Sequence, residues 1–441
     1  MNLLKRVPGY VLNVLDALEQ NNHKSYLVGG AVRDLLLCKQ PKDYDITTSA
    51  LPEQVKSIFS HVVLTGEKHG TVTVVTEQGN VEVTTMRKDG VYKDNRRPET
   101  VGFTDNIIQD LSRRDFTINA MGYNKDGLID PFGGSNALCK GQVIAVGNPT
   151  ERFREDALRM MRAIRFACQL DFLIDTETFV AITRNKSLIR NISAERIRDE
   201  VCKILVSDMP SRGIELMRAT GLLNIIMPEI NNMVGFDQHN PHHHKDVYKH
   251  TLLVLNGVSN DLTLRLAALL HDVGKPVAFT LDEKNTGHFY KHHMVGMDMT
   301  RDILQRLRFD NKTIDTVCIL VKEHMSKYDN LNVKRLINRV GVENLDNLFE
   351  LQIADIRASK PPHDIEGVLK VKEDVTKIIN EKQPLTVKDL KISGYDLMAL
   401  GMEPGREMGK LLNELLELVL ENPKMNNEDC LIRYVREKML Y

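Results

Sequence analysis

The pattern of apolar positions in the first 150 residues predicts a domain built from both helices and strands. Residues Val11–Gln20 have the spacing of an amphipathic helix, and a second helix is expected near Pro52–Phe59. The β-branched runs Thr71–Val75 and Val81–Thr85 are typical of strands, and an apolar strand ends at Leu27-Val28. We therefore predict an α/β arrangement with a mixed sheet for this part of the chain.

From Glu151 onward the apolar spacing becomes that of long helices, and Pro149 marks the expected boundary. A chain of 441 residues is longer than one hydrophobic core normally supports, so we expect two to four domains. The sequence thus predicts a mixed N-terminal domain followed by helical regions.

Composition and charge exclude several classes of protein. The formal net charge is −1, so there is no global basic field, and any nucleic-acid binding must use local patches. Six cysteines lie without Cys-x-x-Cys spacing, which argues against a disulfide framework and against a zinc ribbon. Because no apolar run is long enough to span a bilayer, we expect a soluble cytoplasmic protein without a membrane partner.

Two glycines, Gly29 and Gly30, follow the apolar strand and precede a predicted helix start that carries Arg33. Consecutive glycines let the backbone turn tightly and bring bare N–H groups close to a ligand. The N-terminus of the following helix favours negative charge. A Gly-Gly pair alone usually marks only a turn, but in this setting it predicts a site for a triphosphate.

Two carboxylates, Asp43 and Asp45, lie at the predicted end of a second strand. Side chains of a strand repeat every two residues, so both should project to the same face. Such charges repel unless a cation lies between them, and hard oxygen ligands suit Mg²⁺, although Asp-x-Asp alone is more often a solvated loop. Glu82 is either a third carboxylate or a solvated residue at the sheet edge, and the sequence does not distinguish the two.

Two basic stretches follow the predicted strands. The polar, turn-rich stretch Arg87–Pro98 is expected to be a mobile loop of the kind that gates active sites. Arg113 and Arg114 precede a short apolar segment, and their rigid guanidinium forks suit triphosphate oxygens. A solvated helix end would explain the same pair if nothing else indicated phosphate.

The first long helical pattern places Asp156 and Arg159 one turn apart, with Arg162 and Arg165 continuing the stripe. A carboxylate and a guanidinium side by side offer acceptors and donors that match the Watson–Crick edge of a base. The alternative is a surface salt bridge of little energetic value.

Several motifs in the first half of the chain resemble those of the class II tRNA nucleotidyltransferases, the bacterial CCA-adding enzymes. The resemblance rests on five segments that occur in the family's order: Leu27–Asp34, Asp43–Asp45, Arg113–Asn119, Glu155–Phe166 and Ile192–Glu200. It implies an α+β fold, with a polymerase-β-like head of mixed sheet followed by an all-helical neck, body and tail. The regions are expected at 1–150, 151–206, 207–350 and 351–441.

The resemblance also implies roles for individual residues. Asp43 and Asp45 would hold Mg²⁺, and Gly29, Gly30, Arg33 and Arg114 would contact the triphosphate. Asp156 and Arg159 would act as a protein template that selects CTP and then ATP, with Arg162 and Arg165 beside them. The implied partners are tRNA, CTP and ATP, and the stretch Leu390–Val419 resembles the family's tRNA-holding tail.

The second half contains a His271-Asp272 pair after an apolar helix, together with His250, His292 and His324. Imidazole and carboxylate groups gathered from several helices can hold a second divalent metal. The string around His271-Asp272 resembles the HD phosphohydrolase superfamily, which is helical. A second His-Asp would be expected where the chain has His324-Met325, so the sequence leaves the ligand set and the activity open.

Other functions remain open from the sequence. A poly(A) polymerase uses a similar head, and an enzyme could add only CC or only A. The near-neutral chain favours CCA addition over poly(A) synthesis, and the intact loop Arg87–Pro98 argues against CC addition alone, because CC-adding relatives lack a functional loop there. An alternative of another class is an HD metal phosphohydrolase whose head senses nucleotide. The sequence does not indicate an oligomeric state.

Overall fold

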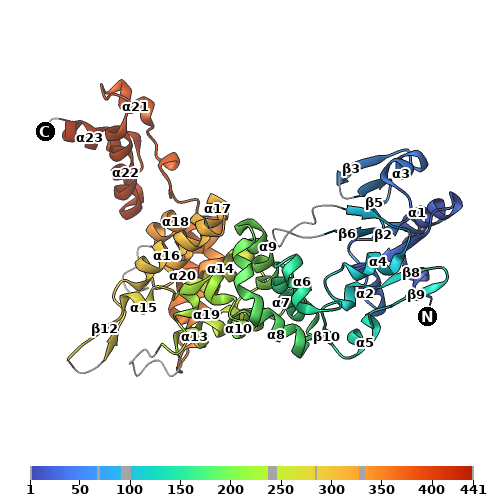
Figure 1. The fold of residues 1–441 in the computed structure, drawn as a ribbon. Helices are drawn as coiled ribbons and strands as arrows, with labels where there is room; N and C mark the ends of the chain where they lie inside the picture. Colours follow the sequence, from blue (N-terminus) through green and yellow to red (C-terminus); the bar gives the residue numbers. More distant parts are fainter. Residues whose placement is uncertain are drawn as a thin grey trace. The chain divides into compact units, whose positions relative to one another are not determined.

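The structure is a computed structural model that describes residues 2–66, 70–90, 101–236, 246–283, 286–326 and 333–439. The chain forms two compact units, Met1–Asn231 and Asn232–Tyr441. Figure 1 shows the large sheet in the first unit, coloured blue to cyan, and a predominantly helical second unit.

Among the described residues, seven strands form a mixed sheet at the centre of the head. The strand order is β3-β4-β5-β2-β1-β8-β9, in which β2 and β5 run parallel and the other neighbours are antiparallel. The strands are β1 (Ser25–Val28), β2 (Asp45–Thr48), β3 (Val62–Gly66), β4 (Thr71–Thr76), β5 (Gly79–Thr85), β8 (Gly122–Asn124) and β9 (Gly127–Ile129).

Helix α1 (Gly9–Gln20) packs on β1 and β5. Its apolar residues recur every three or four positions, which places them on one side of the helix, and Val11, Val14, Leu15 and Leu18 are all buried. The other head elements are α2 (Gly30–Leu36), α3 (Pro52–Ile58), α4 (Ile107–Ser112), α5 (Gly134–Cys139) and the strand pair β6 (Arg87–Asp89) and β7 (Val101–Phe103).

The rest of the first unit is helical apart from the short strands β10 (Gln142–Val143) and β11 (Leu173–Ile174). The amphipathic helix α7 packs one side against α9 and α10. The helices are α6 (Pro149–Glu155), α7 (Arg159–Leu170), α8 (Thr176–Asn185), α9 (Ala194–Leu205), α10 (Pro210–Thr220), α11 (Leu223–Ile226) and α12 (Pro228–Asn231). This arrangement brings the start of α7 next to the head sheet.

The second unit begins with helices that pack around α14 and α17. They are α13 (Val247–Gly257), α14 (Leu262–Leu270), α15 (Lys275–Ala278), α16 (His292–Arg306), α17 (Asn311–Glu323), α18 (Val333–Val340), α19 (Leu345–Ala358) and α20 (Glu366–Asn380), with the hairpin β12 (Thr280–Leu281) and β13 (Gly287–His288). Helix α19 packs against both α13 and α14, so it belongs to the same core as the His-Asp pair.

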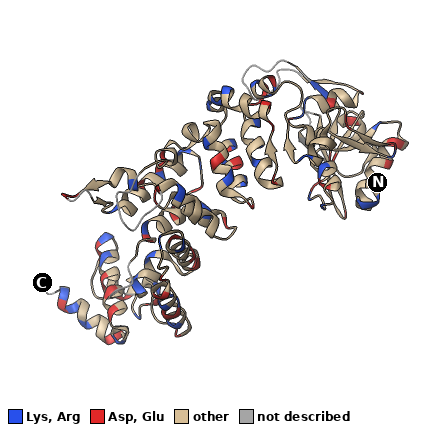
Figure 2. Cartoon of the chain, turned by 90° about the horizontal axis from the view of Figure 1, so that it is seen from below, with Lys and Arg blue, Asp and Glu red and all other residues tan. Residues whose placement is uncertain are grey.

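The last helices have a hydrophobic core of their own. This core extends from Leu390 to Val435 and is formed by α21 (Gly394–Ala399), α22 (Arg406–Glu421) and α23 (Glu428–Met439). Arg335 on α18 forms ion pairs of 2.6 and 2.7 Å with Glu417 and Glu421 of α22. Figure 2 shows basic and acidic residues interspersed along the helices of both units.

The predicted fold class is confirmed: a head with a mixed sheet is followed by helical regions. Short strands interrupt the regions expected to be entirely helical: β11, which pairs with β10 of the head, and the hairpin β12-β13. The predicted strands Thr71–Val75 and Val81–Thr85 correspond to β4 and β5. Among the described residues, no helix has the length and apolar character needed to cross a membrane.

Candidate active site

A cavity of about 620 Å³ lies in the first unit, between the head sheet and the start of α7. All ten residues predicted for nucleotide and metal binding in the head and neck line it: Gly29, Gly30, Arg33, Asp43, Asp45, Arg114, Asp156, Arg159, Arg162 and Arg165. Six further residues complete the lining: Arg113, Asp115, Asn119, Leu158, Phe166 and Arg196. The predicted residues, which are spread over 137 positions from 29 to 165, therefore surround one space.

The two carboxylates Asp43 and Asp45 flank Tyr44, whose side chain is buried. Asp43 is exposed and Asp45 is half-buried, so the acidic side chains lie on the side opposite the tyrosine. The position relative to the strand was predicted wrongly: β2 begins at Asp45 and Asp43 lies in the bend before it. Both carboxylates nevertheless reach the cavity.

Burial raises the pKa of Asp45, the charge of Arg114 counteracts this, and the charges of Glu82 and Asp43 raise the pKa further. Glu82 lies on β5, directly opposite Asp45 in the parallel register of β2 and β5. The alternative for Glu82 was a solvated position at the sheet edge. The edge position is wrong, because β5 lies between β4 and β2, but the side chain is exposed. Three carboxylates therefore contribute negative charge here, which favours a cation.

Gly29 forms the turn between β1 and α2 with a φ of 71° and a ψ of −134°. A Cβ atom at this position would lie 2.8 Å from Nη1 of Arg114, so only glycine lets this arginine approach the backbone. The side chain of Arg33, on the first turn of α2, donates to Asn119 Oδ1 at 2.8 Å and to Asp34 Oδ1 at 2.8 Å. The turn thus brings two guanidinium groups to the edge of the cavity.

Asp110 on α4 anchors the paired arginines, and its carboxylate is fully buried. Arg113 donates to Asp110 Oδ1 through Nε and Nη2, at 2.9 and 2.7 Å, and Arg114 lies 3.7 Å from Oδ2. Burial lowers the pKa of Arg114, an effect that the charge of Asp110 partly offsets. Asp110 was not predicted from the sequence. It lies three residues before Arg113 and four before Arg114, which is the spacing at which side chains contact each other along a helix.

Asp115 links the head to α7 through a double contact with Arg162, whose Nε and Nη2 lie 2.7 and 2.5 Å from Oδ2. Burial raises the pKa of Asp115, but the charges of Arg162 and Arg159 outweigh this and lower it to about 2. The guanidinium groups of Arg33, Arg162 and Arg165 lie 5.4, 5.4 and 4.3 Å from the centre of the Phe166 ring. Cations gather around this ring because its face is electron-rich.

The expected arrangement of Asp156 and Arg159 on one continuous helix is wrong. Asp156 ends α6 with an extended backbone (φ −138°, ψ 105°), and α7 begins only at Arg159. The carboxylate of Asp156 instead accepts hydrogen bonds from Arg196 of α9 at 2.9 and 3.4 Å. The Arg159 guanidinium, which is 11% exposed, donates to Glu155 Oε2 at 2.7 Å and to the carbonyl of Arg113 at 2.8 Å.

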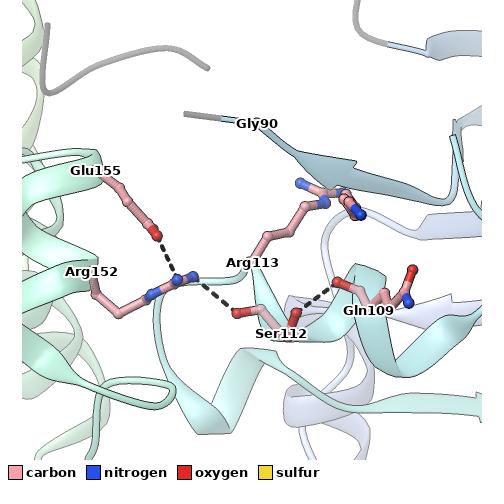
Figure 3. Close-up of a pocket in the computed structure, with 7 residues that line it drawn as sticks. Gly90, Gln109, Ser112, Arg113, Arg152 and Glu155 are labelled. Carbon is pink, nitrogen blue, oxygen red and sulfur yellow. Dashed lines mark hydrogen bonds and ion pairs between the residues drawn. The ribbon is translucent and has the colours of Figure 1, made fainter. Parts of the chain in front are cut away.

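A second cavity of about 290 Å³ lies beside the first and shares Arg113 with it. In Figure 3, Arg152 of α6 reaches the carbonyl of Ser112 at 2.9 Å and pairs with Glu155. Glu155 therefore binds both Arg152 and Arg159, which contact consecutive carbonyls at the end of α4. Of the predicted loop Arg87–Pro98, residues 87–90 are described and form β6 and the following Gly90, whereas 91–98 lie outside the described residues.

The second unit gathers the five residues of the predicted second metal site in a buried cluster. His250 lies on α13, His271-Asp272 follows α14, His292 begins α16 and His324 follows α17. Around the Asp272 carboxylate, Nε2 of His271 and His250 lie 3.2 and 3.7 Å from Oδ2, and Nε2 of His292 and His324 lie 3.4 and 3.9 Å from Oδ1.

Three of these histidines have their tautomer fixed by the backbone. The Nδ1 atoms of His271, His292 and His324 donate to carbonyl oxygens at 2.9, 3.0 and 2.6 Å. Burial and the charge of His271 lower the pKa of His324 to about 3, which keeps its ring neutral. The neutral ring of His324 directs its Nε2 lone pair toward Asp272, as a metal-binding histidine does. For His271, burial lowers the pKa, but the Asp272 carboxylate outweighs this effect and raises it.

Two residues of this cluster were missed from the sequence. Asp355 on α19 accepts a hydrogen bond from His250 Nε2 at 2.8 Å, and the ammonium group of Lys275 lies 2.7 Å from Asp272 Oδ2. Asp355, rather than the residue after His324, thus supplies the second carboxylate. Lys275 follows Asp272 by three residues, so its contact with the His-Asp pair could have been predicted from the sequence. No sequence pattern near Asp355 indicates its contact with the cluster.

Family models match most of the described fold. The poly A polymerase head domain matches residues 25–144, a probable RNA- and SrmB-binding site of polymerase A matches 171–234, and an HD domain matches 242–427. The fold, the cavity and these matches define a nucleotidyltransferase with an RNA-binding region and an HD domain. Both the nucleotidyltransferase and HD families generally use divalent metals.

The relatives narrow this class. A CCA-adding enzyme of Limosilactobacillus reuteri is 34% identical over 96% of this chain and 95% of its own length. That of Levilactobacillus brevis is 33% identical over 96% of each chain. The crystal structure of the Bacillus stearothermophilus CCA-adding enzyme in complex with CTP is 28% identical, covers 97% of this chain and 98% of its own, and has a TM-score of 0.73. The chain belongs to the family of CCA-adding enzymes, as the sequence motifs predicted.

Proposed function

We propose that this chain adds C, C and A to the 3′ ends of tRNA from CTP and ATP, without a nucleic-acid template. The observation that carries the proposal is the single cavity that contains acidic, glycine-turn and arginine groups from the head together with the Asp156 region of the neck. Each group supplies one requirement of nucleotidyl transfer. The L. reuteri and L. brevis relatives are named for the same activity.

Asp43 and Asp45 are the proposed ligands of Mg²⁺. The donor set fits this ion, because hard carboxylate oxygens suit it. Burial raises the pKa of Asp45, and the charges of Glu82 and Asp43, which a cation would offset, raise it further. Bound there, the ion would activate the tRNA 3′ hydroxyl for attack on the α-phosphate and stabilise the departing pyrophosphate. Glu82 adds charge beside Asp45 without lining the cavity.

The triphosphate is proposed to lie over the Gly29-Gly30 turn, with Arg33 and Arg114 as its cationic contacts. Gly29 lets the backbone and Arg114 approach each other closely, and Asn119 holds Arg33 at the cavity edge. Guanidinium forks bind phosphate oxygens in pairs, which orients the α-phosphate as well as neutralising charge.

The base is proposed to be selected by Asp156 and Arg159, with Arg162 and Arg165 nearby. The contact between Asp156 and Arg196 adds a residue to this hypothesis, since Arg196 orients the carboxylate that would accept from the amino group of cytosine or adenine. Selection by fixed side chains explains how a protein can choose nucleotides without a template strand.

We propose four regions with different roles: a nucleotidyltransferase head at 1–150, a nucleotide-selecting neck at 151–206, a body with the HD residues at 207–350 and a tRNA-binding tail at 351–441. The separate core between Leu390 and Val435 supports an independent role for the tail. We also propose a cytoplasmic location, which the six free thiols support. The HD residues are proposed as a second divalent-metal site.

The test is an addition assay with tRNAs that lack one, two or all three terminal nucleotides, given each nucleoside triphosphate alone and together. Wild-type protein should add C to the two shorter tRNAs and A only to tRNA that ends in CC. The double variant Asp43→Ala and Asp45→Ala should lose at least about 10³-fold in activity, because it removes the metal ligands. Asp16→Ala, an exposed carboxylate on α1, is the matched control and should keep full activity. Full activity of the double variant would exclude the mechanism, and addition of A alone to all three tRNAs would indicate a poly(A) polymerase instead.

A further inference from the structure

The second cavity of the first unit, of about 290 Å³, has no part in the proposed reaction. Its volume is roughly ten times the space that one water molecule takes up in the liquid. Three of the described residues that line it are cationic, Lys88, Arg113 and Arg152, and one is a carboxylate, Glu155. The cavity therefore has the size and the charged lining of a site for a hydrated anion.

The buried carboxylate of Asp110 faces two of the arginines around this cavity. Asp110 Oδ1 lies 2.7 Å from Nη2 of Arg113, and Asp110 Oδ2 lies 3.7 Å from Nη2 of Arg114. Arg113 lines both the nucleotide cavity and the second cavity. One negative charge thus faces two positive charges at the place where the two cavities meet.

Glu155, at the end of α6, faces two further arginines. Its carboxylate lies 2.5 Å from Nη2 of Arg152 and 2.7 Å from Nη1 of Arg159. In Figure 3 the pair of Arg152 and Glu155 comes from one side of the cavity and Arg113 from the other. Two carboxylates therefore form ion pairs with four guanidinium groups, which leaves a surplus of two positive charges.

Lys88 adds a positive charge to this surplus. It lies in the middle of β6 and is exposed. No hydrogen bond or ion pair connects its ammonium group to another of the residues that the structure describes. A ligand can therefore use this charge without breaking an ion pair of the protein.

Two other groups that line the cavity have unused donors within the described part of the chain. Gln109 Oε1 accepts from Thr104 Oγ1 at 2.8 Å, so its Nε2 group remains a donor. Arg113 uses Nε and Nη2 on Asp110, which leaves Nη1. An ammonium, an amide and a guanidinium that offer N–H groups to one space suit the oxygens of a phosphate.

We propose that the second cavity binds one phosphate group of the tRNA backbone near the 3′ end, and that Lys88, Gln109 and Arg113 are its contacts. This inference rests on the proposed function and specifies where the tRNA strand is held. Because Arg113 lines both cavities, a strand held here lies directly beside the bound nucleotide. Contacts to backbone phosphates fix the register of a nucleic acid without reading its sequence, which suits an enzyme that accepts successive 3′ ends.

The pyrophosphate product is the other source of a phosphate group at this place. The proposed contacts of the triphosphate, Gly29, Gly30, Arg33 and Arg114, line the nucleotide cavity and are not among the described residues that line the second one. Pyrophosphate is released from those contacts, so the geometry favours the tRNA backbone as the ligand.

The test measures the dissociation constant of tRNA that ends in CC, by fluorescence anisotropy with the full chain and without nucleotides. Lys88→Gln should raise this constant about 5–10-fold at low salt. The slope of its logarithm against the logarithm of salt concentration should decrease by about 0.7, the value for one phosphate of a single strand. The KM for CTP should stay unchanged, because Lys88 does not line the nucleotide cavity.

Two control variants accompany Lys88→Gln. Lys88→Arg keeps the positive charge and should bind tRNA within about 2-fold of wild type. Lys140→Gln removes an exposed lysine of the head that lines neither cavity, and it should behave as wild type. Equal losses in Lys88→Gln and Lys140→Gln would show a general effect of charge and would overturn the proposed site.

A chemically modified substrate identifies the phosphate. In a set of tRNAs that end in CC, the last three phosphodiesters are replaced one at a time by a neutral methylphosphonate. At one position the replacement should weaken binding by wild type about 5–10-fold. It should cause no further loss in Lys88→Gln, because both changes remove the same contact. Additive losses at all three positions would overturn the assignment to the tRNA backbone.

The remaining outcomes separate the two sources of phosphate and the two levels of the argument. Unchanged tRNA affinity in Lys88→Gln, together with a higher inhibition constant for pyrophosphate, would replace the tRNA backbone by free pyrophosphate as the ligand. If neither constant changes while wild type and variant add CCA normally, only the phosphate site is wrong. If wild type does not add CCA to tRNA, the proposed function itself is wrong.

Discussion

The contact between Asp115 and Arg162 gives the sharpest prediction for the first unit. The Asp115 carboxylate is 8% exposed and accepts from Arg162, from the backbone N–H of Phe116 at 2.8 Å and from Asn119 at 3.3 Å. Asp115→Asn keeps the shape of the side chain and removes its charge. The variant would therefore leave the Arg162 guanidinium beside the cavity without its counter-ion.

The size of the effect follows from the pKa of Asp115. Folding lowers this pKa from 3.8 to about 2, and each unit corresponds to about 1.4 kcal/mol, so the charged form contributes roughly 2 to 3 kcal/mol. Arg162 is 34% exposed, and solvent screening reduces this to about 2 kcal/mol. Because the folded pKa is depressed, the contribution is fully present above the unfolded pKa of about 4 and is lost as the pH falls through about 2.

The assay is thermal unfolding of the full chain, read at the transition that CTP raises. For a unit of 231 residues, about 2 kcal/mol corresponds to a decrease of roughly 4–8 °C at pH 7. The decrease should become smaller as the pH falls from 4 to 3, because the carboxylate of the unfolded chain is then protonated while the native carboxylate stays charged. Asp171→Asn, at an exposed pair with Arg212, is the control and should change the midpoint by less than about 2 °C. An unchanged midpoint at pH 7, or a decrease independent of pH, would refute the reasoning.

Two other substitutions test the nucleotide site. Gly29→Ala places a Cβ atom 2.8 Å from Arg114 in a backbone conformation that favours glycine. We expect kcat/KM for CTP to fall at least about 10-fold while the circular dichroism spectrum stays unchanged. Unchanged kinetics would show that the close approach of Arg114 to Gly29 is not needed. Arg196→Lys removes the double contact to Asp156, so the ratio of kcat/KM for CTP and ATP should change about 10-fold with tRNA affinity preserved. An unchanged ratio would exclude Arg196 from base selection.

The ten predicted residues of the cavity could be found from the sequence because each lies in a short local pattern. Gly29 and Gly30 follow an apolar strand, and Asp43 and Asp45 alternate with the buried Tyr44. Strand alternation and glycine turns depend on neighbours a few residues away, so these patterns survive without knowledge of the tertiary fold. The pairing of β1 with β2 then brings the glycines and the carboxylates together, since Val28 lies opposite Asp45.

The local sequence pattern gave a wrong prediction between α6 and α7, where the helical spacing of apolar residues continues although the helix itself is interrupted. The stretch around Asp156 contains no glycine or proline, and its spacing fits one uninterrupted helix. The chain nevertheless ends α6 at Glu155, and Asp156 becomes extended with its carboxylate bonded to Arg196. Tertiary contacts override propensity here, because the extended residue Asp156 forms a partly buried ion pair with Arg196, 40 residues later in the sequence.

Asp355 shows why the partners of buried charges are the hardest residues to find from sequence. It lies 105 residues after His250, on a helix whose pattern otherwise resembles any amphipathic helix. Its importance arises only when α19 packs against α13 and α14 and leaves one carboxylate facing buried histidines. The histidines and Asp272 could be proposed as metal ligands from the sequence motif, whereas the neighbouring charges of Asp355 and Lys275 depend on packing.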